Sequence, residues 1–424
     1  MFDALVNSFR APDIRRRILF VLGMLVLVRG LAHVPVPGID QAALKNVLEA
    51  QPFLQLLDLF SGGGLASFSI IALGVNPYIN ASIIMQLMTG VVPRLQALQR
   101  EGEYGRNKIN QYTRYLTVPM GLLQAYGYLA ILSSPQNGVV TSFETLTQLI
   151  SLTAGTVLLM WIGELITERG IGNGISFIIF AGIVARIPSG LASFLRTPDL
   201  AAGIAFALLG IGAVAAIVYI QEGQRRIPIQ YASRVRGRRM YQGGATFLPL
   251  RVNQAGVIPI IFAVSILLFP VQLAQYFSNS ASGIVADGSH FIINLLDQHA
   301  PLYVVLYFFL TVGFTYFYTA FTFKPDETAD QLRKNGGFIP GIRPGPPTRD
   351  YLSKVVYRIS LAGALFLGIV AVSPIVVGTA FSGSVVGSFS LGGTALLIVV
   401  SVVVETMKQL EAQLMMRNYE GFIR

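Results

Sequence analysis

Charged residues are scarce in this sequence, and reactive side chains are rarer still. Only 12% of the 424 residues are Asp, Glu, Lys or Arg, about half the fraction usual in soluble domains, whereas 53% are hydrophobic. Water is therefore not the main solvent of this chain. Cysteine is absent, which excludes disulfides, thiolate nucleophiles and sulfur-ligated metal sites, and only three histidines are present.

Long apolar runs take the place of the missing polar residues. A bilayer is spanned by about 20 predominantly apolar residues in a helix. Arg29 interrupts the first candidate span and Asn173 shortens the fifth, so these two are the weakest. The ten predicted spans cover residues 18–32, 71–92, 115–132, 149–166, 171–187, 200–220, 255–274, 302–323, 355–377 and 391–407.

The distribution of positive charge tests this list of spans. Cytoplasmic loops of membrane proteins carry an excess of Lys and Arg, and the formal net charge of this chain is +10. With both chain ends placed in the cytoplasm, 27 of the 31 Lys and Arg residues fall on the cytoplasmic side. The four exceptions are Arg29, Lys45, Arg186 and Arg196.

Two of the basic cytoplasmic connections are long, at residues 221–254 and 324–354. Both contain clustered Gly and Pro residues, which are typical of defined turns. We therefore predict two ordered cytoplasmic protrusions. Positive charge in such loops is also expected from membrane topology alone, so it does not by itself identify a binding partner.

A short motif occurs twice, five spans apart. Residues 74–79 read GVNPYI and residues 256–261 read GVIPII, so both fit the pattern G-V-x-P-x-I. A shift of five spans reverses the direction of the chain in the membrane. The halves 1–199 and 200–424 are therefore predicted to be inverted repeats, which place the working site at their interface near the bilayer midplane.

The predicted membrane core carries no evident catalytic or ion-coupling residues. Pumps and secondary transporters normally keep an ionisable residue there, but Glu164, Glu168 and Glu405 lie toward the cytoplasmic ends of their spans. No nucleophile with a positioned base and no metal-binding spacing is evident, so we expect no enzyme, no cofactor and no metal. A small-solute secondary transporter, which inverted repeats also permit, and an intramembrane hydrolase remain alternatives.

Several motifs resemble those of the bacterial SecY family, and they follow one another in the expected order over almost the whole chain. The resemblance implies an all-α polytopic membrane protein, with about ten transmembrane helices in two pseudo-symmetric inverted halves that form a clamshell around a central pore. The motifs are FSGGG at 60–64, GVNPYINASII at 74–84, NQYTR at 110–114, GIGNGIS at 170–176, QRRIP at 224–228, GRR at 237–239, NQAGVIP at 253–259, GGFIPGIRPG at 336–345 and MMRNYEGF at 415–422.

The same resemblance implies two elements that seal the pore. A waist of branched apolar side chains excludes water and ions when it is narrow, yet can adapt to a passing polypeptide. The ring falls on Val75, Ile79, Ile175, Ile179, Ile261 and Ile398. A plug, expected to be a short half-helix that its glycines make easy to displace, comprises Ser61, Gly62, Gly63, Gly64, Leu65, Ala66, Ser67, Phe68, Ser69, Ile70 and Ile71.

A lateral gate and a docking surface are implied in the same way. The gate, a seam between the second and third spans on one side and the seventh and eighth on the other, includes Asn80, Gln124 and Phe269. Docking of the SecA ATPase or of the ribosome falls on Arg226, Arg238, Arg239 and Arg343, because guanidinium groups suit phosphates and carboxylates.

The function implied is that of a protein-conducting channel in the bacterial cytoplasmic membrane. It would pass unfolded secretory chains outward and release hydrophobic segments sideways into the lipid. The expected partners are SecE, SecG, the SecA ATPase, the ribosome, signal peptides, nascent secretory chains and membrane lipid, and no specific DNA binding is expected.

Overall fold

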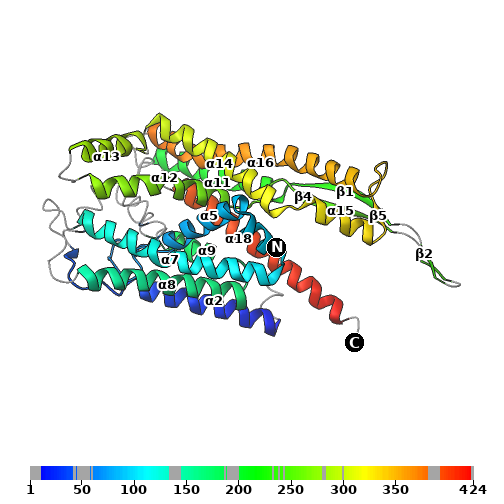
Figure 1. The fold of residues 1–424 in the computed structure, drawn as a ribbon, viewed down its shortest axis with the longest axis horizontal. Helices are drawn as coiled ribbons and strands as arrows, with labels where there is room; N and C mark the ends of the chain where they lie inside the picture. Colours follow the sequence, from blue (N-terminus) through cyan, green and yellow to red (C-terminus); the bar gives the residue numbers. More distant parts are fainter. Residues whose placement is uncertain are drawn as a thin grey trace. The chain divides into compact units, whose positions relative to one another are not determined.

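The computed structural model describes residues 11–41, 44, 58, 61–132, 145–185, 188, 200–231, 234–236, 239–241, 244–278, 283–297, 300–380 and 392–421. The helices are α2 (Pro12–Leu31), α5 (Asn76–Val91), α6 (Pro93–Arg100), α7 (Glu103–Leu132), α8 (Thr145–Arg169), α9 (Gly174–Val184), α11 (Leu200–Glu222), α12 (Ile258–Phe277), α13 (Gly283–Leu295), α14 (Pro301–Thr322), α15 (Pro325–Lys334), α16 (Pro346–Ala380) and α18 (Gly392–Gly421) (Figure 1). The strands are β1 (Gln224–Tyr231), β2 (Arg234–Arg236), β3 (Arg239–Tyr241), β4 (Ala245–Arg251) and β5 (Gly337–Phe338).

Each of the ten predicted spans coincides with a helix, in chain order α2, α5, α7, α8, α9, α11, α12, α14, α16 and α18. By length and mean hydropathy alone, four helical stretches of the described chain qualify as spans: Thr145–Arg169, Ile258–Phe277, Pro301–Lys334 and Pro346–Ser373. The two weakest predicted spans are not among them. Helix α2 carries several arginines, and α9 has 11 residues, or about 17 Å against a hydrocarbon core of about 30 Å.

The chain packs as two compact units. Unit 1 consists of Met1–Leu200, Val264–Tyr303 and Val402–Arg424, and unit 2 consists of Ala201–Ala263 and Val304–Ser401. Helices α12 and α18 therefore begin in unit 2 and end in unit 1. The division into halves at residues 199 and 200, and the inverted symmetry between those halves, stay predictions.

The two copies of the repeated motif adopt the same local conformation. Gly74 and Gly256 have φ angles of 60° and 65°, in the left-handed region that favours glycine. Each lies two residues before a helix, α5 or α12, whose second residue is proline. Proline suits the first turn of a helix because the amide hydrogen it lacks would have no partner there. The repeat is thus a real structural motif at the start of two spans.

In unit 1, close helix contacts depend on glycine. Helix α2 buries Ile14, Val21 and Val28, which lie seven residues apart and form one stripe along the helix. Helix α2 contacts α8 and α9, and α8 in turn contacts α7 and α9. A Cβ atom on Gly174 of α9 would overlap the carbonyl oxygen of Gly163 on α8. These two backbones therefore touch directly, as small residues permit between membrane helices.

In unit 2, the two predicted cytoplasmic protrusions form one structure. Strand β1 from the first connection pairs antiparallel with β4 and with β5 from the second connection, in the order β4-β1-β5. The strands were not predicted, since the pattern indicated turns but no pairing partner. Below the sheet lies a buried apolar cluster of Ile227, Ile229, Leu250, Leu332, Ile339, Leu352, Val355 and Val356, drawn from both connections and the start of α16.

Candidate functional site

Residues 61–71, the predicted plug, form successive turns, so the expected half-helix is wrong. The amide of Phe68 donates to the carbonyl of Leu65 at 3.0 Å, and that of Ser69 to the carbonyl of Gly64 at 2.8 Å. Gly62 and Gly63 have φ angles of 71° and 85°, and Phe68 has a φ of 39°. A right-handed helix needs negative φ at every residue. These positions therefore break a helix before it can form.

Two side chains hold this segment to the end of α2. The guanidinium Nη1 of Arg29 donates to the carbonyl oxygen of Gly62 at 3.0 Å. The hydroxyl of Ser67 donates to the carbonyl oxygen of Ala32 at 2.7 Å. The sequence showed Arg29 as an interruption of the first span and as an exception to the charge pattern, but a single sequence does not show which distant carbonyl a guanidinium reaches.

A short backbone bridge reinforces these side-chain contacts. Pro35 and Ser69 form an isolated antiparallel β-bridge. The amide of Val36 donates to the carbonyl of Phe68 at 2.9 Å, and the amide of Ile70 to the carbonyl of Val34 at 3.0 Å. The segment is thereby hydrogen-bonded like a strand on one side, although it is not itself a strand.

A buried carboxylate closes the first turn of the segment. Asp58 is fully buried, and its Oδ1 accepts hydrogen bonds from the amide of Ala66 at 2.8 Å and from the hydroxyl of Ser61 at 3.4 Å. Its backbone carbonyl accepts from the amide of Gly63 at 2.9 Å. Asp58 precedes the predicted plug and was missed. An acidic residue just before a glycine run is the signal that could have indicated such a capped turn.

Glycines bring the segment against two helices. A Cβ atom on Gly62 would lie 3.0 Å from the Cα of Gly182 on α9, and one on Gly155 of α8 would overlap the carbonyl oxygen of Ile70. The plug glycines were predicted to make the segment easy to displace. The structure gives Gly62 a second role, since it permits backbone-to-backbone packing against α9.

The six predicted ring residues are mostly buried. Val75, Ile79, Ile179, Ile261 and Ile398 are each at most 6% exposed. Ile175 is half-buried, and its Cδ1 lies beside Gly163 of α8. Val75, Ile79, Ile175 and Ile179 belong to unit 1, whereas Ile261 and Ile398 belong to unit 2. The collar that would join them therefore stays a prediction.

The predicted lateral gate contains a contact between α7 and α12 that sequence analysis missed. The ring of Tyr276 lies over Gly127, where any Cβ atom would overlap the aromatic carbons. The Tyr276 hydroxyl donates to the backbone carbonyl of Gln124 at 3.5 Å. Asn80 is buried on α5, and Phe269 is half-buried on α12. Pairing of a glycine with a distant tyrosine leaves no signal in one sequence.

Gln124 itself lies buried beside this contact. The residue is 1% exposed, and within the described part of the chain neither atom of its side-chain amide has a hydrogen-bond partner. On α12, Gln272 is 3% exposed and its Oε1 likewise lacks a partner among the described residues. Each such buried polar group costs about 1–3 kcal/mol, so the packing of α7 and α12 around these amides carries an energetic penalty.

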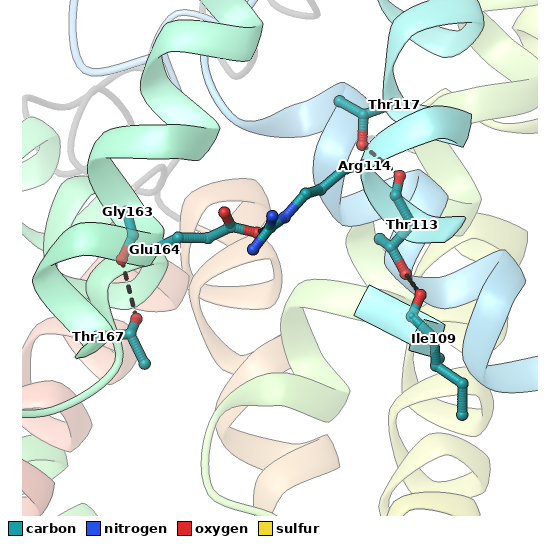
Figure 2. A network of polar contacts seen from close by, with 7 residues as sticks. All are labelled: Ile109, Thr113, Arg114, Thr117, Gly163, Glu164 and Thr167. Carbon is teal, nitrogen blue, oxygen red and sulfur yellow. Dashed lines mark hydrogen bonds and ion pairs between the residues drawn. The ribbon is translucent and has the colours of Figure 1, made fainter. Parts of the chain in front are cut away.

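An ion pair links the first half of α7 to the second half of α8 (Figure 2). The Nε of Arg114 donates to Oε1 of Glu164 at 2.7 Å, and the two side chains are 50% and 22% exposed. The threonines drawn beside the pair donate to carbonyls of their own helices, for example Thr117 to Thr113 at 2.8 Å. The sequence predicted that Glu164 lies toward the cytoplasmic end of the fourth span but did not identify its partner. The pair neutralises a carboxylate close to the membrane core.

The predicted docking arginines differ in how far the structure describes them. Arg226 is exposed on β1, and Arg343 is exposed in the turn between β5 and α16. Arg238 lies outside the described residues, and Arg239 begins β3, with only its backbone described.

The turn that carries Arg343 is held firmly. Gly341 and Gly345 have φ angles of 81° and 108°, and the hydroxyl of Thr348 donates to the carbonyl oxygen of Arg343 at 2.9 Å. The buried Ile339 anchors the start of the turn in the apolar cluster under the sheet. The Arg343 side chain is therefore presented outward on a fixed backbone.

Known proteins with similar sequences belong to one family. The family model of SecY matches residues 69–407. The protein translocase subunit SecY of Streptomyces scabiei is 46% identical over 443 residues, and that of Mycobacterium bovis is 44% identical over 444 residues. Both matches cover 100% of this chain and 100% of the relative.

Solved channel structures share the fold at lower identity. A SecY protein whose plug domain stabilises the closed state of the translocation channel matches with a TM-score of 0.66, and Sec61 of a canine ribosome-channel complex with 0.60. Both are 18% identical, and both matches cover 93% of this chain and 91% of the other. The chain therefore belongs to the bacterial SecY family of multi-pass membrane proteins, which form the protein-conducting channel of the Sec translocase and are not enzymes.

Proposed function

We propose that this chain seals its translocation channel with residues 61–71 and opens when that segment leaves its site. The observation that carries the proposal is the set of hydrogen bonds that fix a non-helical segment, donated by Arg29 and Ser67 and accepted by Asp58. In this role the chain lies in the bacterial cytoplasmic membrane with both ends in the cytoplasm. It passes unfolded secretory chains outward and releases hydrophobic segments into the lipid.

The segment suits a plug because its attachment is specific but limited. A typical hydrogen bond contributes about 0.5–1.5 kcal/mol net, so the few that hold residues 61–71 fix one closed position without making release prohibitive. No helical ladder within the segment has to be broken. The segment can therefore move while α2, α8 and α9 stay folded.

The ring completes the seal at the waist. Val75, Ile79, Ile175, Ile179, Ile261 and Ile398 are apolar, and all but Val75 and Ile175 follow the start of a span by similar intervals. A constriction of such side chains offers no hydrogen bonds to water or ions, so it dewets when narrow. A polypeptide in transit fills the same space and keeps it closed to small solutes.

The contact between α7 and α12 suits a seam that opens sideways. Tyr276 closes over Gly127, while Gln124 and Gln272 leave buried amide atoms without partners in the described structure. Opening gives those amides access to new partners, and it breaks the long hydrogen bond from Tyr276 to Gln124. We infer that an apolar signal peptide can part this seam at small cost, with Asn80 and Phe269 in the same seam.

Cytoplasmic partners dock on the protrusion formed by β1, β4, β5 and α15. Arg226 and Arg343 are exposed on it, and Arg238 and Arg239 belong to the same connection. Guanidinium groups bind carboxylates of a motor ATPase such as SecA and phosphates of ribosomal RNA. A solved channel of similar fold, canine Sec61, is part of a ribosome-channel complex, which supports the ribosome as a partner. SecE and SecG brace the membrane helices in this arrangement.

Arg29→Gln should loosen the plug. A hydrogen bond from a charged donor contributes about 1.5–3 kcal/mol. Arg29 is exposed, so its hydrogen bond should contribute at the lower end of this range. A change of about 1.4 kcal/mol alters an equilibrium constant tenfold, here the one between the seated and the displaced segment. We expect openings of reconstituted channels in planar bilayers to become roughly ten times more frequent. Arg17→Gln, on the same helix and also exposed, is the control, and equal opening rates for both variants would contradict the role of Arg29.

Serine at Ile79, Ile261 and Ile398 together should let ions leak through the resting channel. Hydroxyl groups at a narrow waist supply hydrogen bonds that stabilise water there. The measurement is the ion flux across proteoliposomes containing the variant. Ile84→Ser changes an exposed isoleucine on α5 and should leave the flux at the level of the parent. A triple variant as tight as the parent would show that the waist lies elsewhere.

Gly127→Leu should hold the seam apart, because its side chain must displace the ring of Tyr276. We expect export of a reporter with a defective signal peptide to rise above the parent level. Gly23→Leu, at a helix position with nothing within 4 Å, is the matched control. If Gly127→Leu exports a reporter with an intact signal peptide normally but still rejects the defective one, the contact between α7 and α12 is not the seam that a signal peptide opens.

Arg343→Glu should abolish SecA-driven transport while the thermal unfolding temperature in detergent stays unchanged. The Arg343 side chain is exposed, so its reversal should leave the fold intact, whereas a docked carboxylate would be repelled. Lys334→Glu, an equal charge reversal at an exposed position of α15, should lower transport far less. An equal loss of transport in both variants would show that net charge of the protrusion matters and the Arg343 position does not, and normal transport by Arg343→Glu would remove the docking role.

A further inference from the structure

Helix α13 carries an exposed apolar stripe that nothing in the pore, gate or docking face explains. It has 13 residues and connects the spans α12 and α14. Five of its large apolar side chains are exposed, at 87% for Ile284 and 65% for Phe291 in the extreme cases, and the other three are Val285, Ile292 and Leu295. An apolar face of this kind on a surface helix marks an interaction site.

The side chains of α13 fall into three sectors around the helix. At 100° per residue, the five exposed apolar residues occupy one arc of about 120°. The next arc contains Ser289, Ile293 and Ala286, which are buried or half-buried and so face the protein. The remaining arc carries three exposed polar residues, Asp287, His290 and Asn294. The helix thus has a protein side, an apolar side and a water side.

The chain fixes the end of the membrane at which α13 lies. Helix α12 begins seven residues after β4, on the side of the basic strands, so α13 follows the opposite end of α12. Five residues separate α12 from α13, which limits the gap to about 20 Å. Within unit 1, Figure 1 shows α13 at the end where α7 finishes and α8 starts. If the basic side is cytoplasmic, α13 therefore lies at the opposite, outward-facing surface of the cytoplasmic membrane.

We propose that α13 is an interfacial helix whose apolar stripe contacts the acyl chains of the outer leaflet. Its length of about 20 Å is too short to cross a core of about 30 Å but suits one leaflet. A water side next to an apolar side is what a helix at the lipid boundary requires. In lipid an apolar face needs no protein partner, since acyl chains are as apolar as leucine.

The charge of α13 further defines the lipid contact. The helix contains Asp287 and His290 but no Lys or Arg. Interfacial helices that select anionic lipids carry basic residues on the polar face. We therefore expect α13 to contact the leaflet through its apolar area alone, with no preference for anionic headgroups.

The experiment uses the single tryptophan of the chain, Trp161. In a Trp161→Phe background, Phe291→Trp places a reporter in the apolar sector and Asn294→Trp places one in the water sector three residues away. Each whole chain is reconstituted in liposomes, and the emission of the Trp161→Phe parent is subtracted. Bromines on the lipid acyl chains quench tryptophan in the membrane, and added iodide quenches tryptophan in water.

We expect brominated lipid to cause a large loss of emission from position 291 and little from position 294, with iodide giving the reverse. This result should be the same in neutral and in partly anionic vesicles. Equal quenching of both reporters by iodide would overturn the proposal in favour of a water-exposed stripe. Protection of position 291 from both quenchers would overturn it in favour of a protein cover, such as a second copy of the chain.

Discussion

Within a bilayer every backbone polar group must find its hydrogen bond inside the protein, and this constraint governs the least regular part of the chain. Residues 61–75 form turns, yet they pack against Gly155 and Gly182, which both lie within spans. Irregular backbone at membrane depth is tolerated only where protein or a water-filled cavity surrounds it. Arg29, Asp58, Ser67 and the bridge to Pro35 supply the bonds that a helix would have made internally.

Glycine meets a second requirement of the same environment. Helices in lipid gain little from burying apolar surface, so close van der Waals contact and short polar contacts hold them together. Gly163 and Gly174 let α8 and α9 touch, Gly155 lets α8 reach the predicted plug, and Gly127 accepts the ring of Tyr276. The contact between Gly163 and Gly174 joins two helices of unit 1. The contact between Gly127 and Tyr276 joins α7 to α12, where the proposed function calls for a contact that can break.

Charge and apolar surface are distributed unevenly between two parts of the chain. The sheet β4-β1-β5 and the apolar cluster below it hold a basic protrusion, with Arg343 on a turn to which Thr348 is hydrogen-bonded. Helix α13 lacks basic residues and exposes an apolar stripe. The protrusion thus suits the acidic partners proposed for it, and α13 suits the proposed contact with lipid. The ion pair of Arg114 and Glu164 joins α7 to α8 and neutralises both of these charges.

The sequence by itself indicated the membrane class, ten helical segments and the family, and it predicted a cytoplasmic placement for the basic loops. These follow from hydropathy, charge and ordered motifs, which are local properties of the chain. The GVxPxI repeat was also visible, and the left-handed Gly74 and Gly256 confirm its local form. Only the tertiary structure showed that Arg29 and Asp58 hold residues 61–71, that these residues form turns and that Tyr276 covers Gly127. Such contacts join residues far apart in the chain, and the partner is chosen by packing, which no local pattern encodes.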